Sequence, residues 1–118
     1  MKEILQLKLG HLQESPLKPD PLGRRMMGWE SGLDPHAVWE RSRGVWPFNP
    51  KRAKAAGLVR FVNPDGIVVC VATVTDTEPY GPRLNILIGE VIADHPEIGL
   101  PTPDEWEGRP TYRYFPQP

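Results

Sequence analysis

Several features that would point directly to a function are scarce or missing in this chain of 118 residues. It has a single cysteine, Cys70, so no internal disulfide can form, and its place within an apolar run favours a small packed side chain. No apolar stretch is long enough to span a bilayer, and no charged segment followed by an apolar one marks a secretory signal. We therefore expect a cytoplasmic protein without a membrane partner.

A large net charge is missing as well, because 14 lysines and arginines nearly balance 15 aspartates and glutamates. Any binding to nucleic acid must then come from a local basic patch. None of the three histidines has a second histidine or a cysteine pair at the spacing of metal ligands. The glycines are scattered and form no phosphate-binding loop. We expect neither a metal nor a cofactor.

Proline, in contrast, is abundant, with 15 residues in the chain against an average usage of about 5%. Such a content predicts much irregular backbone and few long helices. Prolines and glycines are dense in residues 10–33, which we predict to be a long ordered loop. Residues 93–118 are proline-rich and acidic, and we predict that they wrap the surface. The length suits one domain, residues 1–118, around one core.

The centre of the chain predicts a β-hairpin. Two apolar, β-branched runs flank Asn63-Pro64-Asp65-Gly66, and these four residue types suit a tight turn. The second run, residues 67–74, is apolar on both faces, which is typical of a central strand that is covered on both sides. Further strands are expected at residues 2–9, 84–92 and 111–115, and residues 76–83 are expected to form a loop.

Two short helices are predicted before this hairpin. Asp34 and Asn49 are good N-cap residues, each is followed by a proline, and Gly44 and Gly57 suit the helix ends. With the strands, these helices predict an α+β domain. Its small, curved, mainly antiparallel sheet is expected to close toward a β-barrel.

Basic residues are concentrated between positions 41 and 60, where six lysines and arginines occur without an aspartate or glutamate. This basic window can be a solvated face, it can pair with the acidic half of the chain, or it can form an anion site. Neighbouring aromatic residues favour a surface that stacks a base and holds its phosphate. The predicted nucleic-acid-binding residues are Trp29, Arg43, Trp46, Lys51, Arg52, Lys54 and Arg83.

The order of these features resembles the PUA-like superfamily, the small barrels that include the EVE, ASCH and YTH domains. The residues that carry the resemblance are Trp39, Arg41-Ser42-Arg43-Gly44-Val45-Trp46, residues 50–56, residues 58–61, Gly66-Ile67-Val68, Gly81-Pro82-Arg83 and Gly89. The resemblance covers about residues 39–92 and implies a curved barrel whose pocket receives a nucleotide, in some members a modified base. The long segment before Asp34 and the acidic tail depart from this pattern.

Two other functions stay open. Asp76 and Glu78 follow the central strand, near Tyr80 and Arg83, and a small enzyme can use such a strand-end cluster, although loop solvation explains it equally well. The proline-rich acidic tail suits a protein-interaction module. Binding of a nucleic acid or nucleotide is the preferred interpretation, and the sequence also allows a homodimer.

Overall fold

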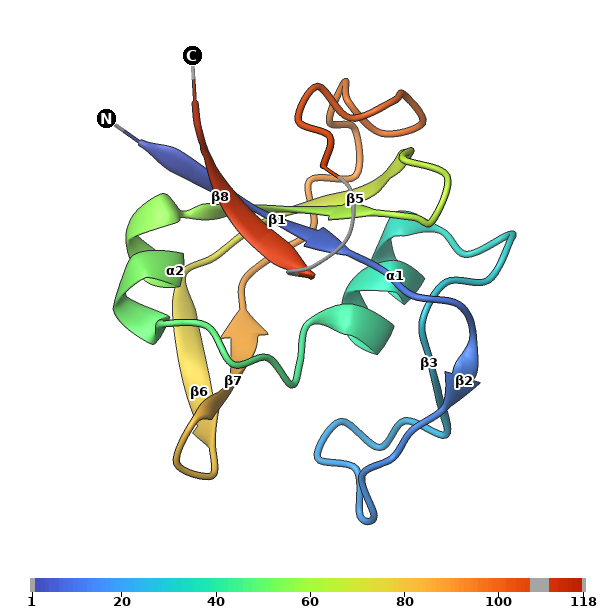
Figure 1. Ribbon diagram of the computed structural model, residues 1–118, viewed down its shortest axis with the longest axis vertical. Coiled ribbons are helices and arrows are strands. Elements are labelled where there is room, and N and C mark those ends of the chain that lie inside the picture. The colour runs from blue at the N-terminus through green and yellow to red at the C-terminus, as the bar shows by residue number, and fades with distance from the viewer. Residues whose placement is uncertain (1, 107–110, 118) are drawn as a thin grey trace.

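The computed structural model describes residues 2–106 and 111–117, and this part of the chain forms an α+β fold (Figure 1). Its strands and helices are β1 (Glu3–Lys8), β2 (Gln13–Glu14), β3 (Met26–Met27), α1 (Pro35–Ser42), α2 (Pro50–Ala56), β4 (Leu58–Val62), β5 (Val68–Thr73), β6 (Asp76–Tyr80), β7 (Leu84–Ile88) and β8 (Tyr112–Pro116). Four of the strands form the main sheet in the order β5-β4-β1-β8, and two hairpins, β2–β3 and β6–β7, stand apart from it.

The main sheet is mixed. β4 pairs antiparallel with β5 but parallel with β1, and β1 pairs antiparallel with β8. The parallel pair arises because a long connection containing both helices joins β1 to β4. The predicted β4–β5 hairpin is confirmed. Its turn is closed by the Asn63 side chain, which accepts hydrogen bonds from the backbone N–H groups of Asp65 and Ile67, both at 3.0 Å. No closed barrel is found among the described residues.

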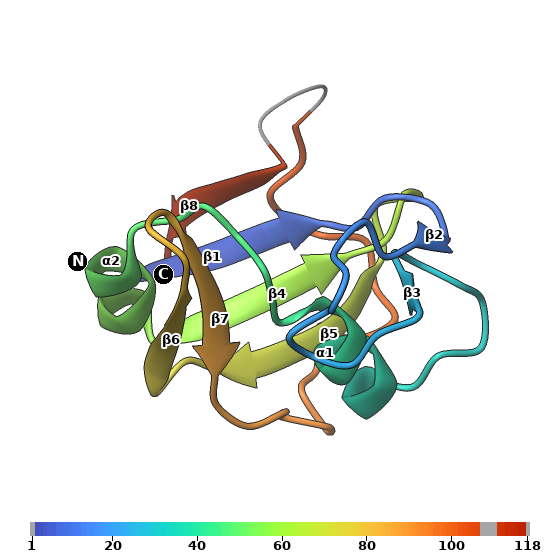
Figure 2. The ribbon, with the colours of Figure 1, turned by 90° about the horizontal axis from the view of Figure 1, so that it is seen from below.

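Each face of the main sheet is covered by a different part of the chain (Figures 1 and 2). The two helices and the β6–β7 hairpin lie on one face, called the inner face here, over a core that includes Leu5, Leu7 and Phe61, all fully buried. Residues 93–106 lie on the outer face. There Ile98 packs against a small cluster of valines around Val71. Burial of β5 confirms that this strand is covered on both faces, but it is not central, because it stands at one end of the sheet order.

Local capping chemistry sets both helices, as predicted. The carboxylate of Asp34 accepts from the backbone N–H of Ala37 at 2.8 Å, and the side chain of Asn49 accepts from the first turn of α2. Gly57 ends α2 with a φ of 74°, a left-handed conformation that favours glycine.

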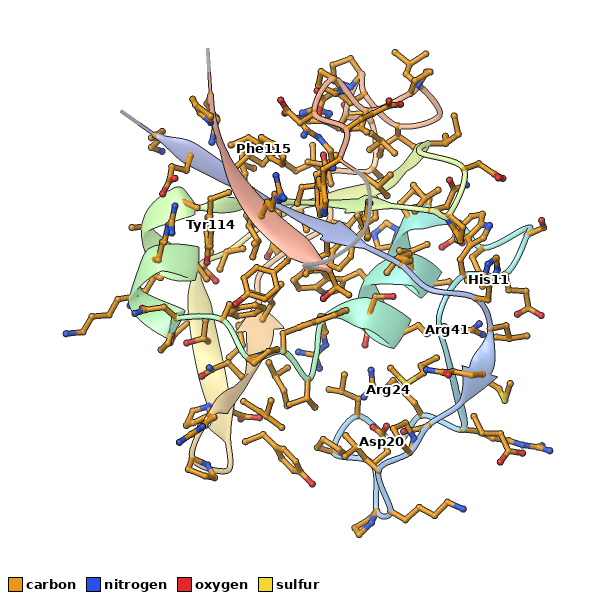
Figure 3. All side chains as sticks on the ribbon, in the orientation of Figure 1. His11, Asp20, Arg24, Arg41, Tyr114 and Phe115 are labelled. Carbon is orange, nitrogen blue, oxygen red and sulfur yellow. The ribbon has the colours of Figure 1, made fainter. Side chains whose placement is uncertain are left out.

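Three segments differ from expectation. The strand expected at residues 84–92 is shorter, because β7 ends at Ile88. Residues 76–80 are not a loop, because they form β6 and pair along its whole length with β7. The predicted loop at residues 10–33 is largely irregular but includes the short strands β2 and β3. Within it, Asp20 and Arg24 form an ion pair at 2.9 Å (Figure 3). Arg24 also donates to the carbonyl oxygens of Arg41 and Gly44, which ties the loop to the end of α1.

The C-terminal segment behaves partly as predicted. Residues 93–106 cover the outer face without regular structure, and β8 confirms the expected short final strand. Residues 107–110 and 118 of the predicted wrap lie outside the described residues. In the part of the chain that the structure describes, no helix is both long and apolar enough to cross a membrane.

Candidate functional site

Most side chains of the basic window are engaged with carboxylates. Arg52 meets Glu3 at 2.8 Å, and Lys54 lies 3.8 Å from Asp76. The remaining ion pairs of the window are Arg41 with Glu30, Arg43 with Glu40, and Arg60 with Glu97 and Asp104. The window is therefore divided over several parts of the surface and, at Arg60, over the interior.

The predicted aromatic residues lie apart from α2. Trp46 is half-buried, packs against the core and donates from Nε1 to the carbonyl oxygen of Ser42 at 2.8 Å. It lines a small cavity of about 50 Å³ together with His11 and Arg41. Trp29 is also half-buried against the core. These indoles are held by packing.

Two further predicted residues have separate surroundings. Arg43 donates from Nη1 to the carbonyl oxygen of Leu87 at 3.2 Å, which fastens the end of α1 to β7. Arg83 is exposed in the turn between β6 and β7. Of the seven predicted residues, three lie in α2. Lys51 and Arg52 stand at its start, Lys54 lies one turn later beside Asp76, and the other four lie elsewhere.

A groove of about 320 Å³ lies beside α2, and we call it the α2–β8 groove. Its lining residues are Asn49, Arg52, Tyr112, Arg113 and Tyr114. The sheet register explains how they meet. Tyr112 and Tyr114 pair with Leu7 and Leu5, whose side chains are in the core, so both tyrosine rings lie on the inner face, where α2 packs.

Arg52 is held in one orientation at this groove. Its Nε and Nη2 donate to the two carboxylate oxygens of Glu3 at 3.0 and 2.8 Å. Its Cζ also lies 4.0 Å from the centroid of the Tyr114 ring. A two-bond fork and a stacked ring together fix the plane of a guanidinium group. The side chain nevertheless remains 54% exposed, so this plane is accessible from solvent.

The ion pair between Arg52 and Glu3 sets the charge at the groove. The hydrogen bonds from Arg52 lower the pKa of Glu3 below its ordinary value of 4.5, and Glu3 in turn raises the pKa of Arg52. Burial raises the pKa of Tyr114 to about 12. Both groups of the ion pair are therefore charged at neutral pH, and they compensate each other. Lys51, which precedes Arg52 in α2, is exposed and adds positive charge, whereas the Arg113 side chain lies on the outer face, 5.5 Å from the centroid of the Trp106 ring.

The tyrosine rings are packed in place. The Tyr112 ring meets Phe48 edge-on at 5.9 Å and Tyr114 edge-on at 6.4 Å, and its hydroxyl donates to the carbonyl oxygen of Pro47 at 3.4 Å. The sequence predicted a strand through these tyrosines but did not connect it with α2. The alternation Tyr112-Arg113-Tyr114, which puts two aromatic rings on one face of a strand, was the available signal.

A larger cavity, of about 570 Å³, lies elsewhere among the described residues, between the β4–β5 turn and residues 102–106. Its lining includes Lys8 and the acids Asp65 and Glu105, so the charge of this cavity is mixed. The strand-end acids considered for an enzyme, Asp76 and Glu78, line neither this cavity nor the α2–β8 groove. Within the described residues, no group of three or more metal-ligating side chains is found.

Comparisons of the chain with protein-family models, with curated proteins and with solved structures found no match. The resemblance to the PUA-like superfamily therefore stays a prediction from the sequence.

Proposed function

We propose that this chain binds a nucleotide or single-stranded nucleic acid in the α2–β8 groove. The observation that carries the proposal is the fixed and accessible guanidinium plane of Arg52, which Tyr114 covers on one side. Arginine planes and tyrosine rings are the surfaces on which proteins stack unpaired bases. A base that stacks on the solvent side of Arg52 would meet a group that needs no further ordering.

Charge and size support the same ligand. Because Glu3 compensates Arg52, the positive charge left to meet a phosphate comes from Lys51, the exposed neighbour of Arg52 in α2. The groove, about 320 Å³ in volume, is at the lower end of the size range of small-ligand sites. One nucleotide, or one unit of a single strand, suits these dimensions better than a duplex.

The proposal agrees with what the PUA-like resemblance implies, a nucleotide site on a curved sheet that closes toward a barrel. We also propose that the protein acts in the cytoplasm. The site differs from the one predicted from the sequence. It keeps Lys51 and Arg52 and adds Tyr112, Arg113 and Tyr114 from β8. An enzyme with a strand-end acidic site and a protein-interaction module remain the alternatives.

Fluorescence anisotropy with a labelled single-stranded oligonucleotide, at two salt concentrations, tests the proposal. Arg52→Lys keeps the charge but loses the planar fork, so it should weaken binding about tenfold and leave the salt dependence unchanged. Lys51→Ala should reduce the salt slope by about 0.7, the contribution of one phosphate contact in a single strand. Arg83→Ala removes a charge from the distant β6–β7 turn and is the matched control, expected to bind like the parent.

Two results would contradict this function. One is an unaltered chain that shows no binding to the oligonucleotide or to mononucleotides. The other is a loss of affinity in Arg83→Ala as large as in Arg52→Lys, since that would indicate a diffuse charge effect.

A further inference from the structure

The two edges of the main sheet differ in whether other parts of the chain cover them. The β5 edge is closed by later parts of the chain, because Val68 N–H donates to the carbonyl oxygen of Leu100 at 2.9 Å and Thr73 N–H donates to that of Glu90 at 2.8 Å. β8 forms the opposite edge (Figure 2). Within residues 2–106 and 111–117, no backbone hydrogen bond to its outer side is found. An uncovered strand edge is a ready template for another strand.

The ladder with β1 fixes which backbone groups of β8 point outward. Lys8 N–H donates to the carbonyl oxygen of Thr111 at 2.8 Å, and Gln117 N–H donates to that of Lys2 at 2.9 Å. In an antiparallel pair, hydrogen-bonding residues alternate along each strand. Arg113 and Phe115 therefore face β1 with their backbone groups. The N–H and C=O groups of Tyr112 and Tyr114, and the carbonyl of Pro116, face outward.

We propose that the partner for this edge is a second copy of this chain, paired antiparallel along β8 and centred on Tyr114. In this register, Tyr114 lies opposite Tyr114 of the second copy, and the two residues exchange both N–H···O bonds. Tyr112 N–H donates to the carbonyl oxygen of Pro116 across the two-fold axis. Proline lacks an N–H group, but only its carbonyl is needed there.

Side-chain chemistry selects this register. It places Arg113 opposite Phe115 of the second copy on the outer face, a cation beside an aromatic ring. Within each copy Arg113 already lies beside an aromatic ring, 5.5 Å from the centroid of Trp106, and the Trp106 ring lies 5.6 Å from that of Phe115 at a tilt of 40°. The competing register, centred on Arg113, brings two arginines directly opposite each other, and like charges in that position are destabilising.

The pairing would join two main sheets into one and bring the two α2–β8 grooves to either side of the two-fold axis. Each Arg52 already carries its own counter-ion, Glu3, so this approach adds no uncompensated charge. The inference does not depend on the proposed function. A dimer that binds no nucleotide, or a monomer that binds one, separates the two.

Sedimentation velocity over a range of concentrations tests for the dimer, and cysteine cross-linking tests its register. In an antiparallel hydrogen-bonded pair the Cα atoms lie about 5.5 Å apart, which suits a disulfide. Tyr114→Cys should therefore cross-link two copies on oxidation. Arg113→Cys is the matched control and should not, because position 113 faces position 115. Cys70 is fully buried and gives a silent background.

A chain that sediments as a monomer at every concentration would overturn the proposal, and cross-linking of Arg113→Cys in preference to Tyr114→Cys would overturn its register. If Tyr114→Cys fails to fold, p-hydroxyphenyllactic acid incorporated at position 114 removes only the outward N–H and keeps the ring. That backbone ester should weaken the dimer about tenfold or more without changing the fold of the monomer. An unchanged dimer would contradict the pairing.

Discussion

Arg60 donates to both carboxylate oxygens of Glu97, from Nε at 3.0 Å and from Nη2 at 3.1 Å. Arg60 lies in β4 and is only 4% exposed, whereas Glu97 belongs to the acidic segment over the outer face. Gln6 and Asp104 accept from its Nη1. One member of the basic window thus fastens the acidic segment to the sheet, which is the pairing between the two halves that the sequence left open.

Replacing Arg60 should lower the free energy of unfolding. Arg60→Ala removes the shared partner of two carboxylates, and breaking a buried ion pair costs about 3 kcal/mol or more of the free energy of unfolding. Lys54→Ala is the control, since Lys54 and Asp76 are 3.8 Å apart and both more than half exposed, and an exposed pair contributes at most about 1 kcal/mol. Urea unfolding measures both. Equal, small losses would mean that apolar contacts alone hold the acidic segment.

A second expected outcome concerns the close approach of Gly89 to β5. A Cβ atom at this position would lie 1.8 Å from the carbonyl oxygen of Thr73, a backbone atom that cannot move aside. Gly89→Ala should therefore cost at least about 3 kcal/mol, the upper end of the usual range for overpacking. Gly10→Ala is the matched control, because nothing lies within 4 Å of its Cβ position. Thermal unfolding compares them, and equal melting temperatures would show that the β5 edge rearranges freely.

Asp20 should make the stability of the fold decrease at acid pH. Burial raises the pKa of this carboxyl, but hydrogen bonds from Ser15, from Leu22 N–H and from Arg24 outweigh it and leave the pKa below 3.8. A folded-state pKa below the unfolded one gives stability that is complete above the unfolded pKa and is lost as pH falls through the folded pKa.

Asp20→Asn should therefore lose less stability than the parent chain between about pH 5 and about pH 2, although it starts from a lower value at neutral pH. Asp94→Asn, at an exposed position, is the charge-matched control. Denaturant unfolding at several pH values gives the slopes. Parallel curves for the parent and Asp20→Asn would show that this carboxylate is not linked to acid unfolding.

Local chemistry made much of the fold predictable. Both helices and the central hairpin were found because their caps and turn, at Asp34, Asn49 and residues 63–66, act within a few residues of the element that they shape. β6 was missed because Asp76, Glu78 and a proline are poor strand formers. Pairing with β7 overrides that preference, and no local pattern reports a partner strand.

The candidate site was predictable only on its α2 side. Lys51 and Arg52 stood out by charge, but the groove also needs Tyr112 and Tyr114, which reach α2 only because β8 pairs with β1 and α2 packs on β1. The contact between α2 and β8 depends on a third element, β1, so the spacing of residues in the sequence does not indicate it. The separation of Trp46 from this site has the same origin, since its position is set by packing against the core.

The last prediction concerns the hydroxyl of Tyr114, which is buried and has no hydrogen-bond partner among the described residues. An unsatisfied buried hydroxyl costs about 1–3 kcal/mol. Tyr114→Phe removes it and keeps a ring beneath Arg52, so the variant should be at least as stable as the parent at neutral pH.

Burial also raises the pKa of Tyr114 from its ordinary value of 10 to about 12. Because the folded pKa is the higher one, the parent should lose stability as pH rises from about 10 to about 12, and Tyr114→Phe should lose less. Tyr112→Phe is the control, since it removes a hydroxyl that donates to Pro47 at 3.4 Å. Urea unfolding at a fixed protein concentration, at neutral pH and at about pH 11, measures both effects. A neutral-pH loss in Tyr114→Phe larger than in Tyr112→Phe would show that the Tyr114 hydroxyl has a partner in solution.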